Sequence, residues 1–404
     1  MQNRTNSETK TTHHKLTVIV LVVTGLFMVI FLGLALAHEL RPLEVVNVQG
    51  VAEDLAINTS TNTTDSNIAE VPIELPLDKP DYATRMLRLA NNSLFALLSD
   101  SSMEVVATST GSTTTELIEA EDPEELYASH NKRWPAEDGY PEVGAILPFH
   151  RIIAYYGNFY SRQMGALGEY EPEEVKERLL AEVANWEAAD PSTPVMPAID
   201  YIAVVAQADA GRDGMYRNRM PDSEIQKAVD LARELEGIVF LEIQAGLSDL
   251  QVEIEYFEKW LKLPEVHLAI DPEFRMKNGN QPGRVIGMVD AVDVNLTIEY
   301  LDKLVEAGGL PPKILIVHRF TQNMVTNATA IKPSPTTQVV MVMDGWGPQA
   351  NKIGTYYHVV EPEPVQFTGF KVFYKNDLKP PSTGLMSPKD ILDLSPRPIF
   401  IQYQ

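Results

Sequence analysis

The chain has 404 residues, 44% of them hydrophobic, and is long enough to bury one large core or two smaller ones. Its formal net charge of −23 would repel a phosphate backbone, which excludes nucleic acid as an expected partner. The chain contains no cysteine, and this excludes disulfides, thiolate metal sites and cysteine nucleophiles.

The first apolar segment, Leu16–Ala37, carries no charge and is long enough to cross a bilayer as a helix. Three basic residues lie within residues 1–15, which places this end in the cytoplasm and the rest of the chain outside it. We therefore expect a single-pass signal anchor. The alternative is a cleaved signal peptide, because Ala35-Leu36-Ala37 has the small-x-small pattern of a signal-peptidase site.

Residues 38–133 have the composition of an extracytoplasmic stalk. Asn58–Asn67 and Thr108–Glu116 are rich in Ser, Thr and Asn and nearly devoid of large apolar residues, so they bury too little to offset the entropy of ordering. Between them, residues 82–99 place Met and Leu at roughly helical spacing, which predicts one amphipathic helix.

From residue 134 to residue 404 the pattern becomes regular. Eight apolar runs, mostly separated by helix-like segments, predict a (β/α)8 TIM-barrel-like domain, since strands buried on both faces read as nearly continuous apolar runs. The runs are Ile152–Phe159, Val195–Ala206, Ile238–Gln244, Val266–Asp271, Lys313–Phe320, Gln338–Gly347, Phe367–Tyr374 and Pro398–Gln404. A doubly wound sheet is the alternative, but no glycine-rich phosphate loop supports it.

The chain ends on the eighth strand, so no final helix covers that face of the predicted barrel. We expect the helix within residues 82–99 to fold back and fill this place.

Functional side chains of TIM barrels gather at the C-terminal ends of the strands. Three carboxylates occupy such positions, Glu242 on the third strand and Asp271 and Glu273 at the end of the fourth, and they are the predicted catalytic residues. Glu242 lies inside an apolar run, where a carboxylate needs a partner. Its structural alternative is a salt bridge to Arg275 or Lys371.

Other polar and aromatic residues near the strand ends are predicted to bind substrate. They are Tyr156, Asn158, Asp200, Gln244, Arg275, His318, Arg319, Asp344, Trp346 and Tyr374. Several acids converging with a histidine and arginines would raise some carboxylate pKa values and lower others, as acid and base partners require.

In architecture, residues Ile152–Gln404 resemble the glycoside-hydrolase-like TIM barrels of bacterial cell surfaces. The resemblance implies a carbohydrate-active hydrolase that acts on glycans with paired carboxylates, and Glu273 matches the acid at the fourth strand. The sequence departs at the seventh strand, where the largest retaining clan carries its nucleophile: Tyr374 and Lys375 stand there, and Asp377 is the only acid beyond them.

Two other functions remain open. The first alternative is a non-catalytic binding or structural subunit of a membrane-associated assembly, with a membrane-protein partner. The second is a metal-dependent ester or phosphoester hydrolase, in which the strand-end acids and His318 hold a divalent metal. No compact metal motif is present, so the sequence predicts no metal ligand set and no cofactor.

Overall fold

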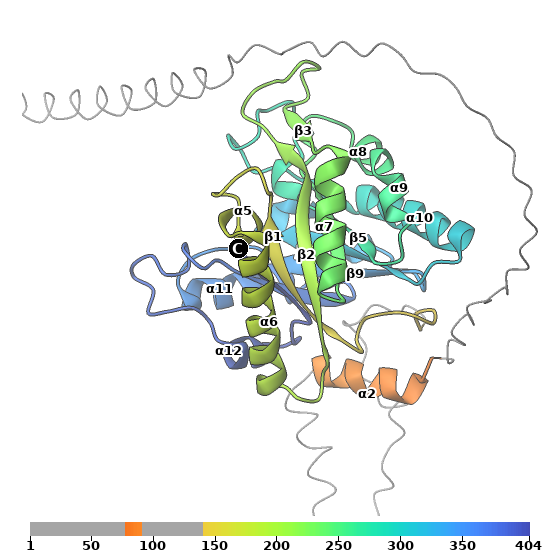
Figure 1. Ribbon diagram of the computed structural model, residues 1–404, viewed down its shortest axis with the longest axis vertical. Coiled ribbons are helices and arrows are strands. Elements are labelled where there is room, and N and C mark those ends of the chain that lie inside the picture. Colours follow the sequence, from red (N-terminus) through yellow and green to blue (C-terminus); the bar gives the residue numbers. More distant parts are fainter. Residues whose placement is uncertain (1–76, 91–139) are drawn as a thin grey trace, which may run out of the picture. The chain divides into compact units, whose positions relative to one another are not determined.

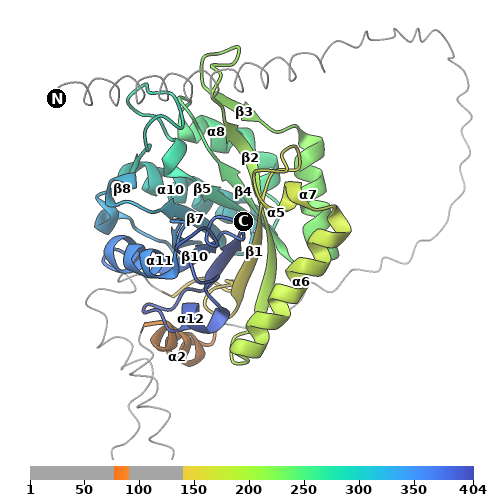
Figure 2. The ribbon, with the colours of Figure 1, turned by 90° about the vertical axis from the view of Figure 1, so that its left-hand side faces the viewer.

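The computed structural model describes residues 77–90 and 140–404. Eight parallel strands pair in one sheet, and the pairing of the first with the second closes this sheet into a barrel. They are β1 (Arg151–Gly157), β2 (Val195–Ala206), β4 (Ile238–Ile243), β5 (Val266–Ile270), β7 (Lys313–Arg319), β9 (Thr337–Met343), β10 (Phe367–Val372) and β11 (Phe400–Tyr403). The predicted TIM-barrel-like fold and its eight strands are confirmed (Figures 1 and 2).

Helices surround the barrel and fill most of the connections between its strands. The helices are α2 (Lys79–Ala90), α5 (Ala166–Glu169), α6 (Pro172–Ala189), α7 (Asp222–Glu234), α8 (Leu250–Tyr256), α9 (Glu258–Leu261), α10 (Ala291–Gly308), α11 (Gln349–Thr355) and α12 (Pro388–Leu392). Short 3-10 turns are η1 (Pro272–Phe274), η2 (Gln322–Met324) and η3 (Ala328–Ala330), and η4 (Tyr356–Val360) is a π-helix. Short strands outside the barrel are β3 (Arg217–Arg219), β6 (Val289–Asp290) and β8 (Val325–Thr326).

Local sequence explains where several of these helices begin. Helix α6 starts on Pro172, whose missing N–H costs nothing at a first turn, and acids follow it. Helix α12 opens with a capping box in which Ser387 and Asp390 satisfy each other's backbone N–H groups. Asp290 and Asp293 form the same arrangement at the start of α10.

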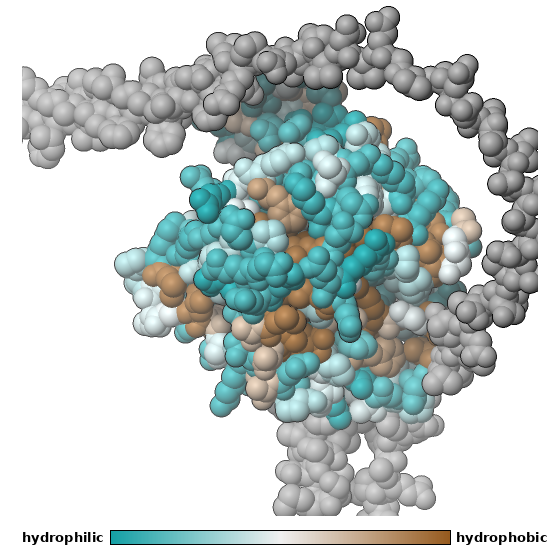
Figure 3. All heavy atoms as spheres, viewed as in Figure 1, coloured by the Kyte–Doolittle hydropathy of each residue, from teal (hydrophilic) through white to brown (hydrophobic). Residues whose placement is uncertain are grey.

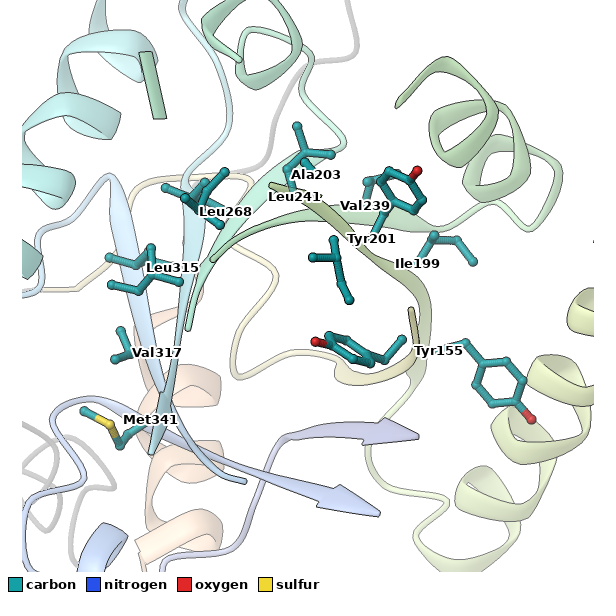
Figure 4. Packing of buried hydrophobic residues seen from close by; sticks show 14 of the residues in the cluster. Tyr155, Ile199, Tyr201, Ala203, Val239, Leu241, Leu268, Leu315, Val317 and Met341 are labelled. Carbon is teal, nitrogen blue, oxygen red and sulfur yellow. The ribbon is translucent and has the colours of Figure 1, made fainter. Parts of the chain in front are cut away.

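Each strand divides its side chains between two apolar regions. Side chains that point outward, such as Tyr155, Tyr201 and Leu315, pack in the layer between the strands and the helices (Figure 4). Side chains that point inward fill the barrel. Most of those near the starts of the strands, such as Ile152 and Phe240, are apolar. Successive side chains of a strand point to opposite faces, and this alternation produces the division. The face of the barrel domain seen in Figure 3 is largely hydrophilic, with groups of hydrophobic residues between the hydrophilic ones.

Helix α2 closes the barrel at the end where the strands begin (Figures 1 and 2). Its Tyr82, Met86 and Leu89 belong to the apolar cluster of the barrel interior. The backbone N–H of Arg397 donates to the carbonyl of Leu89 at 2.7 Å, just before β11. The expectation that this helix lies beside the last strand is therefore wrong, because its apolar face matches the open lower mouth. Residues 91–99 of the predicted helix lie outside the described residues.

The outer face of the last strand is covered by α6 instead. The indole N–H of Trp186 donates to the hydroxyl of Tyr403 at 2.9 Å, and Tyr374 stacks on Tyr403 with ring centroids 5.3 Å apart. No helix within residues 77–90 and 140–404 is long and apolar enough to cross a membrane. The predicted anchor at Leu16–Ala37 and most of the predicted stalk lie outside these ranges.

Candidate active site

A cleft of about 530 Å³ opens at the C-terminal mouth of the barrel. The residues that line it come from the strand ends and the segments that follow them. They are Tyr156, Gln163, Met164, Ile202, Ala206, Gln244, Asp271, Glu273, Phe274, Phe320, Asp344, Gly345, Trp346, Asn351, Thr355, Lys371, Phe373 and Gln404. Three carboxylates and one ammonium thus face the cleft among aromatic and amide side chains.

Alternation along the strands explains why these residues meet. The inward positions of β10 are Phe367, Gly369 and Lys371, and those of β7 end in His318. Inward residues two apart share a face, so apolar side chains fill the lower barrel. Polar side chains take the inward positions at or just after the strand ends, such as His318, Lys371 and Asp344. The charged groups therefore gather at the floor of the cleft: Asp344 and Lys371 line it, and Glu242 and His318 lie beneath it.

Asp344, at the end of β9, is held by two cations. The ammonium of Lys371 lies 3.2 Å from its Oδ1, and Nδ1 of His318 lies 3.2 Å from its Oδ2. Burial alone would raise the pKa of Asp344, but the charges of Lys371 and His318 lower it below its usual value. Asp344 is therefore an ionised carboxylate at the edge of the cleft.

Glu273 has the opposite environment. It lies in the turn η1 after β5, is partly buried, and its carboxylate makes no ion pair or hydrogen bond with any other described residue. Burial and then the negative charge of Asp344 raise its pKa. Asp271 caps the same turn by accepting the N–H of Glu273 at 3.0 Å, and burial together with the charge of Glu242 raises its pKa.

Glu242 does not line the cleft. Its side chain is fully buried beneath it, where Oε1 accepts the hydroxyl of Tyr156 at 2.8 Å and the amide of Gln244 at 2.9 Å. Its Oε2 lies 3.2 Å from Nε2 of His318. The structural alternative considered for Glu242, a salt bridge to Arg275 or Lys371, is thus replaced by an ion pair with His318.

His318 is also fully buried and lies between Glu242 and Asp344. Burial alone would lower its pKa, but the two carboxylates raise it to about 10, so the ring is an imidazolium at neutral pH. Asp200 lies deeper in the barrel and accepts the amide of Gln402 at 2.8 Å. Burial and the charge of Glu242 raise the pKa of Asp200.

One group of described residues has the spacing of a metal site. Ligand atoms of Asp200, Glu242 and His318 lie within 4.8 Å of one another, and all three residues are buried. A small cation held there would take His318 away from its ion pairs with Glu242 and Asp344. The mixed oxygen and nitrogen donors suit manganese or zinc better than calcium.

Several predicted binding residues lie away from the cleft. Arg319 points outward to Glu363 at 2.7 Å, and Tyr374 donates its hydroxyl to Glu182 at 2.7 Å. Arg275 lies 3.8 Å from Asp249. Asn158 donates to the carbonyl of Ile202 at 3.0 Å and fastens the loop after β1. Trp346, in contrast, lines the cleft and is 58% exposed.

Lys371 was not among the predicted site residues, although it occupies the inward end of the seventh barrel strand. It contacts Asp344 and also lies over the ring of Tyr156, 3.9 Å from the centroid. The position at which the resemblance implies a nucleophile therefore holds a cation. Lys371 could have been found from its spacing, because it lies four residues after Phe367 and two after Gly369 and so faces the same side of the strand.

No family model and no curated protein matches the sequence. The solved structures that are similar to the chain include a cellulase and a mannanase. Cellulase Cel5C_n is 13% identical, with 60% of this chain and 71% of the cellulase covered and a TM-score of 0.32. The Bacillus subtilis mannanase man26 is 14% identical, with 63% of this chain and 79% of the mannanase covered and a TM-score of 0.34. The resemblance to glycoside-hydrolase-like TIM barrels is one of architecture, and the roles of the cleft residues follow from their own surroundings.

Proposed function

We propose that the barrel is a carbohydrate-active hydrolase that cleaves a glycosidic bond in the cleft at its C-terminal mouth. One observation carries the proposal: Glu273 and Asp344 face the same cleft, and Lys371 and His318 hold Asp344 while no side chain in residues 77–90 and 140–404 pairs with Glu273. Two carboxylates whose surroundings push their pKa values apart are suited to separate acid and base roles.

Glu273 is the proton donor. Its raised pKa favours the protonated form, and no other described residue bonds its carboxyl group, which leaves the proton for the departing sugar oxygen. Asp344 remains ionised and stabilises the positive charge that develops on the sugar ring when the glycosidic bond breaks. Water from the solvent forms the new bond to the anomeric carbon, and the carboxylate of Asp344 accepts its proton.

The remaining walls of the cleft suit a sugar. The exposed ring of Trp346 offers a flat apolar face on which a pyranose can stack. The amides of Gln163 and Asn351 line the cleft and can bond hydroxyl groups as donors and acceptors. Asp271 lines it as a further acceptor or donor. Glu242, predicted as catalytic from the sequence, supports the site from below the cleft.

The test is hydrolysis of a panel of polysaccharides and aryl glycosides by the wild-type chain, E273Q and D344N. Removing the acid or the ionised carboxylate should lower kcat about 10²- to 10⁴-fold on natural glycans. E273Q should lose far less on dinitrophenyl glycosides, because that leaving group departs without a proton. The exposed E187Q and D230N, on α6 and α7, are the matched controls and should leave activity unchanged.

The proposal fails if the wild-type chain cleaves no glycosidic bond on the panel, or if E273Q and D344N remain as active as the controls. Binding of an oligosaccharide without cleavage would instead identify the chain as the non-catalytic binding module considered from the sequence.

We also propose that the domain acts outside the cytoplasm, anchored by Leu16–Ala37, because that segment is uncharged, spans a bilayer in length and follows basic residues. Membrane fractionation and protease treatment of intact cells test this. Recovery of the chain in the soluble cytoplasmic fraction would contradict it.

A further inference from the structure

A small cavity lies at the end of the barrel where the strands begin, and it shares no lining residue with the cleft. Its volume is about 10 Å³, which is room for one ion or molecule of about the size of water. Four arginines line it: Arg85 and Arg88 on α2, Arg151 at the start of β1 and Arg397 just before β11. The formal net charge of the chain is −23, so this cavity gathers positive charge in a strongly acidic protein.

Arg151 lacks acceptors for most of its N–H groups. It lies on the outward face of β1, two residues before Ile153, and its side chain is fully buried. Its Nη2 donates to Oδ2 of Asp190 at 2.8 Å, but its buried Nε and Nη1 have no hydrogen-bond partner within residues 77–90 and 140–404. A buried charged donor without an acceptor costs stability. An acceptor for these N–H groups can lie in the cavity that Arg151 lines.

The arginines also lie close enough to repel one another. Burial lowers the pKa of Arg151, and the charge of Arg397 lowers it further against the opposing charge of Asp190. Burial and the charge of Arg88 lower the pKa of Arg397 in the same way. Asp190 is shared, because its Oδ2 also lies 3.9 Å from Nη1 of Arg397 and accepts the hydroxyl of Thr193 at 3.0 Å. This one carboxylate therefore does not satisfy the guanidinium of Arg151.

The walls and the size of the cavity select the ligand. Guanidinium groups donate about twice as strongly to a charged acceptor as to a neutral one, which favours an anion over water. Sulfate and phosphate each carry four oxygens around a central atom and exceed the space of one water, so a monatomic anion fits best.

We propose that the cavity binds a chloride ion, which accepts the N–H groups of Arg151 at Nε and Nη1 and lies beside the guanidinium groups of Arg85 and Arg397. The bound ion joins α2 to the first and last strands of the barrel, because the arginines come from all three. The site is separate from the cleft and does not depend on the proposed hydrolysis.

The first test is thermal unfolding of the full-length chain in sodium chloride and in sodium gluconate at equal ionic strength. Both salts screen the net charge equally, so a difference between them reports binding of the anion to the folded chain. Chloride should raise the Tm of the wild type by about 2 to 4 °C, and bromide should replace it. R233Q, which changes an exposed arginine on α7 that also forms ion pairs, is the matched control and should keep the shift.

Two variants test the arginines. R151Q alone would leave Asp190 without its buried partner, so R151Q/D190N removes one charge of each sign, and its Tm should not differ between the two salts. R85Q changes a partly exposed side chain whose partner Asp81 is also exposed, and it should fold normally. It should raise the chloride concentration that gives half of the shift about tenfold, since one charged donor is lost.

The ³⁵Cl resonance provides a direct measurement, because chloride that exchanges with a protein site gives a broader line. The wild type and R233Q should broaden the line, bromide should remove the broadening, and R151Q/D190N should not broaden it. Equal Tm values of the wild type in chloride and gluconate would overturn the inference and show that another acceptor fills the cavity. A chloride effect that R85Q and R151Q/D190N both retain in full would also overturn it. A larger Tm shift with sulfate than with chloride would overturn the assignment of a monatomic anion.

Discussion

His267 and His318 are both buried inside the barrel, on β5 and β7, yet their surroundings give them opposite charges. His267 lies in the lower half, where its Nδ1 accepts the backbone N–H of Ile314 at 3.0 Å and its ring is tilted against Phe240. Burial and then the charge of Lys313 lower its pKa well below the usual value, so it is neutral. His318, between two carboxylates in the upper half, is charged.

The difference shows how one barrel combines a stable core with a reactive layer. The lower half excludes water with apolar side chains and α2, and it tolerates a polar group only when it is neutral and hydrogen-bonded. The upper half buries four acidic side chains beside the cations His318 and Lys371, at a cost to stability that the lower half must offset. The four acids are Asp200, Glu242, Asp271 and Asp344.

The largest expected effect lies in the lower half. Phe240 fills the barrel centre, with its ring centroid 5.4 Å from that of Phe400. F240A should lower the free energy of unfolding by about 3 to 5 kcal/mol, because the closed barrel cannot collapse around the cavity. Urea unfolding followed by circular dichroism measures this. A loss below about 1 kcal/mol would show that the lower half is not the stabilising core.

The second effect concerns the closure of the barrel by α2. Met86 is fully buried between this helix and the barrel interior, so M86A should cost about 2 to 5 kcal/mol in unfolding free energy. L180A, on the exposed side of α6, is the control and should change stability by less than about 0.5 kcal/mol. Equal effects of the two changes would contradict the place assigned to α2.

We expect the two histidines to make the free energy of unfolding depend on pH in opposite directions. The pKa of His318 is raised from 6.5 to about 10, so its stabilising contribution is complete below pH 6.5 and is lost as pH rises toward 10. The pKa of His267 is lowered, so its contribution is present above pH 6.5 and is lost as pH falls below that value. Each group adds at most about 1.4 kcal/mol per pH unit.

The comparison of variants separates the two contributions. H267Q keeps an acceptor for the N–H of Ile314 and should flatten the loss of stability between pH 6.5 and 5. H318Q/E242Q should flatten the loss between pH 7 and 10, and the exposed H358Q should change neither limb. Urea unfolding across this pH range provides the measurement. Identical limbs in the wild type and in both variants would show that neither histidine has the shifted pKa assigned to it.

The alternation of side chains along a strand explains which parts of the site could be predicted from the sequence. The eight strands followed from long apolar runs, and Asp271, Glu273, Asp344 and Trp346 followed from their places at strand ends. A place at the end of a strand was not sufficient to identify a site residue, because consecutive strand residues face opposite sides. Arg319 points outward when its neighbour His318 points inward.

Contacts across the barrel could not be predicted in this way. The partner of Glu242 depends on which strands face each other across the barrel and on their stagger, and a local sequence pattern specifies neither of these. The same holds for α2, whose amphipathic spacing predicts a helix with an apolar face but does not say which surface it covers. Lys371, in contrast, could have been identified by following the inward positions of its strand from Phe367.

The smallest expected effect on stability is that of removing the Trp346 ring, which tests whether the cleft wall, unlike the buried layer, contributes little to stability. Its ring is 58% exposed and the ammonium of Lys379 lies 5.2 Å from its centroid, so W346A should change the unfolding free energy by less than about 0.5 kcal/mol. Loss of a stacking surface should nevertheless weaken oligosaccharide binding roughly tenfold, since an aromatic contact contributes about 0.5 to 1.5 kcal/mol beyond its buried area. Isothermal titration calorimetry with an oligosaccharide hydrolysed by the wild type, using D344N as the inactive background, measures that affinity. Unchanged affinity in W346A/D344N would place the sugar on another wall of the cleft, while a large loss of stability would show that the ring is part of the core.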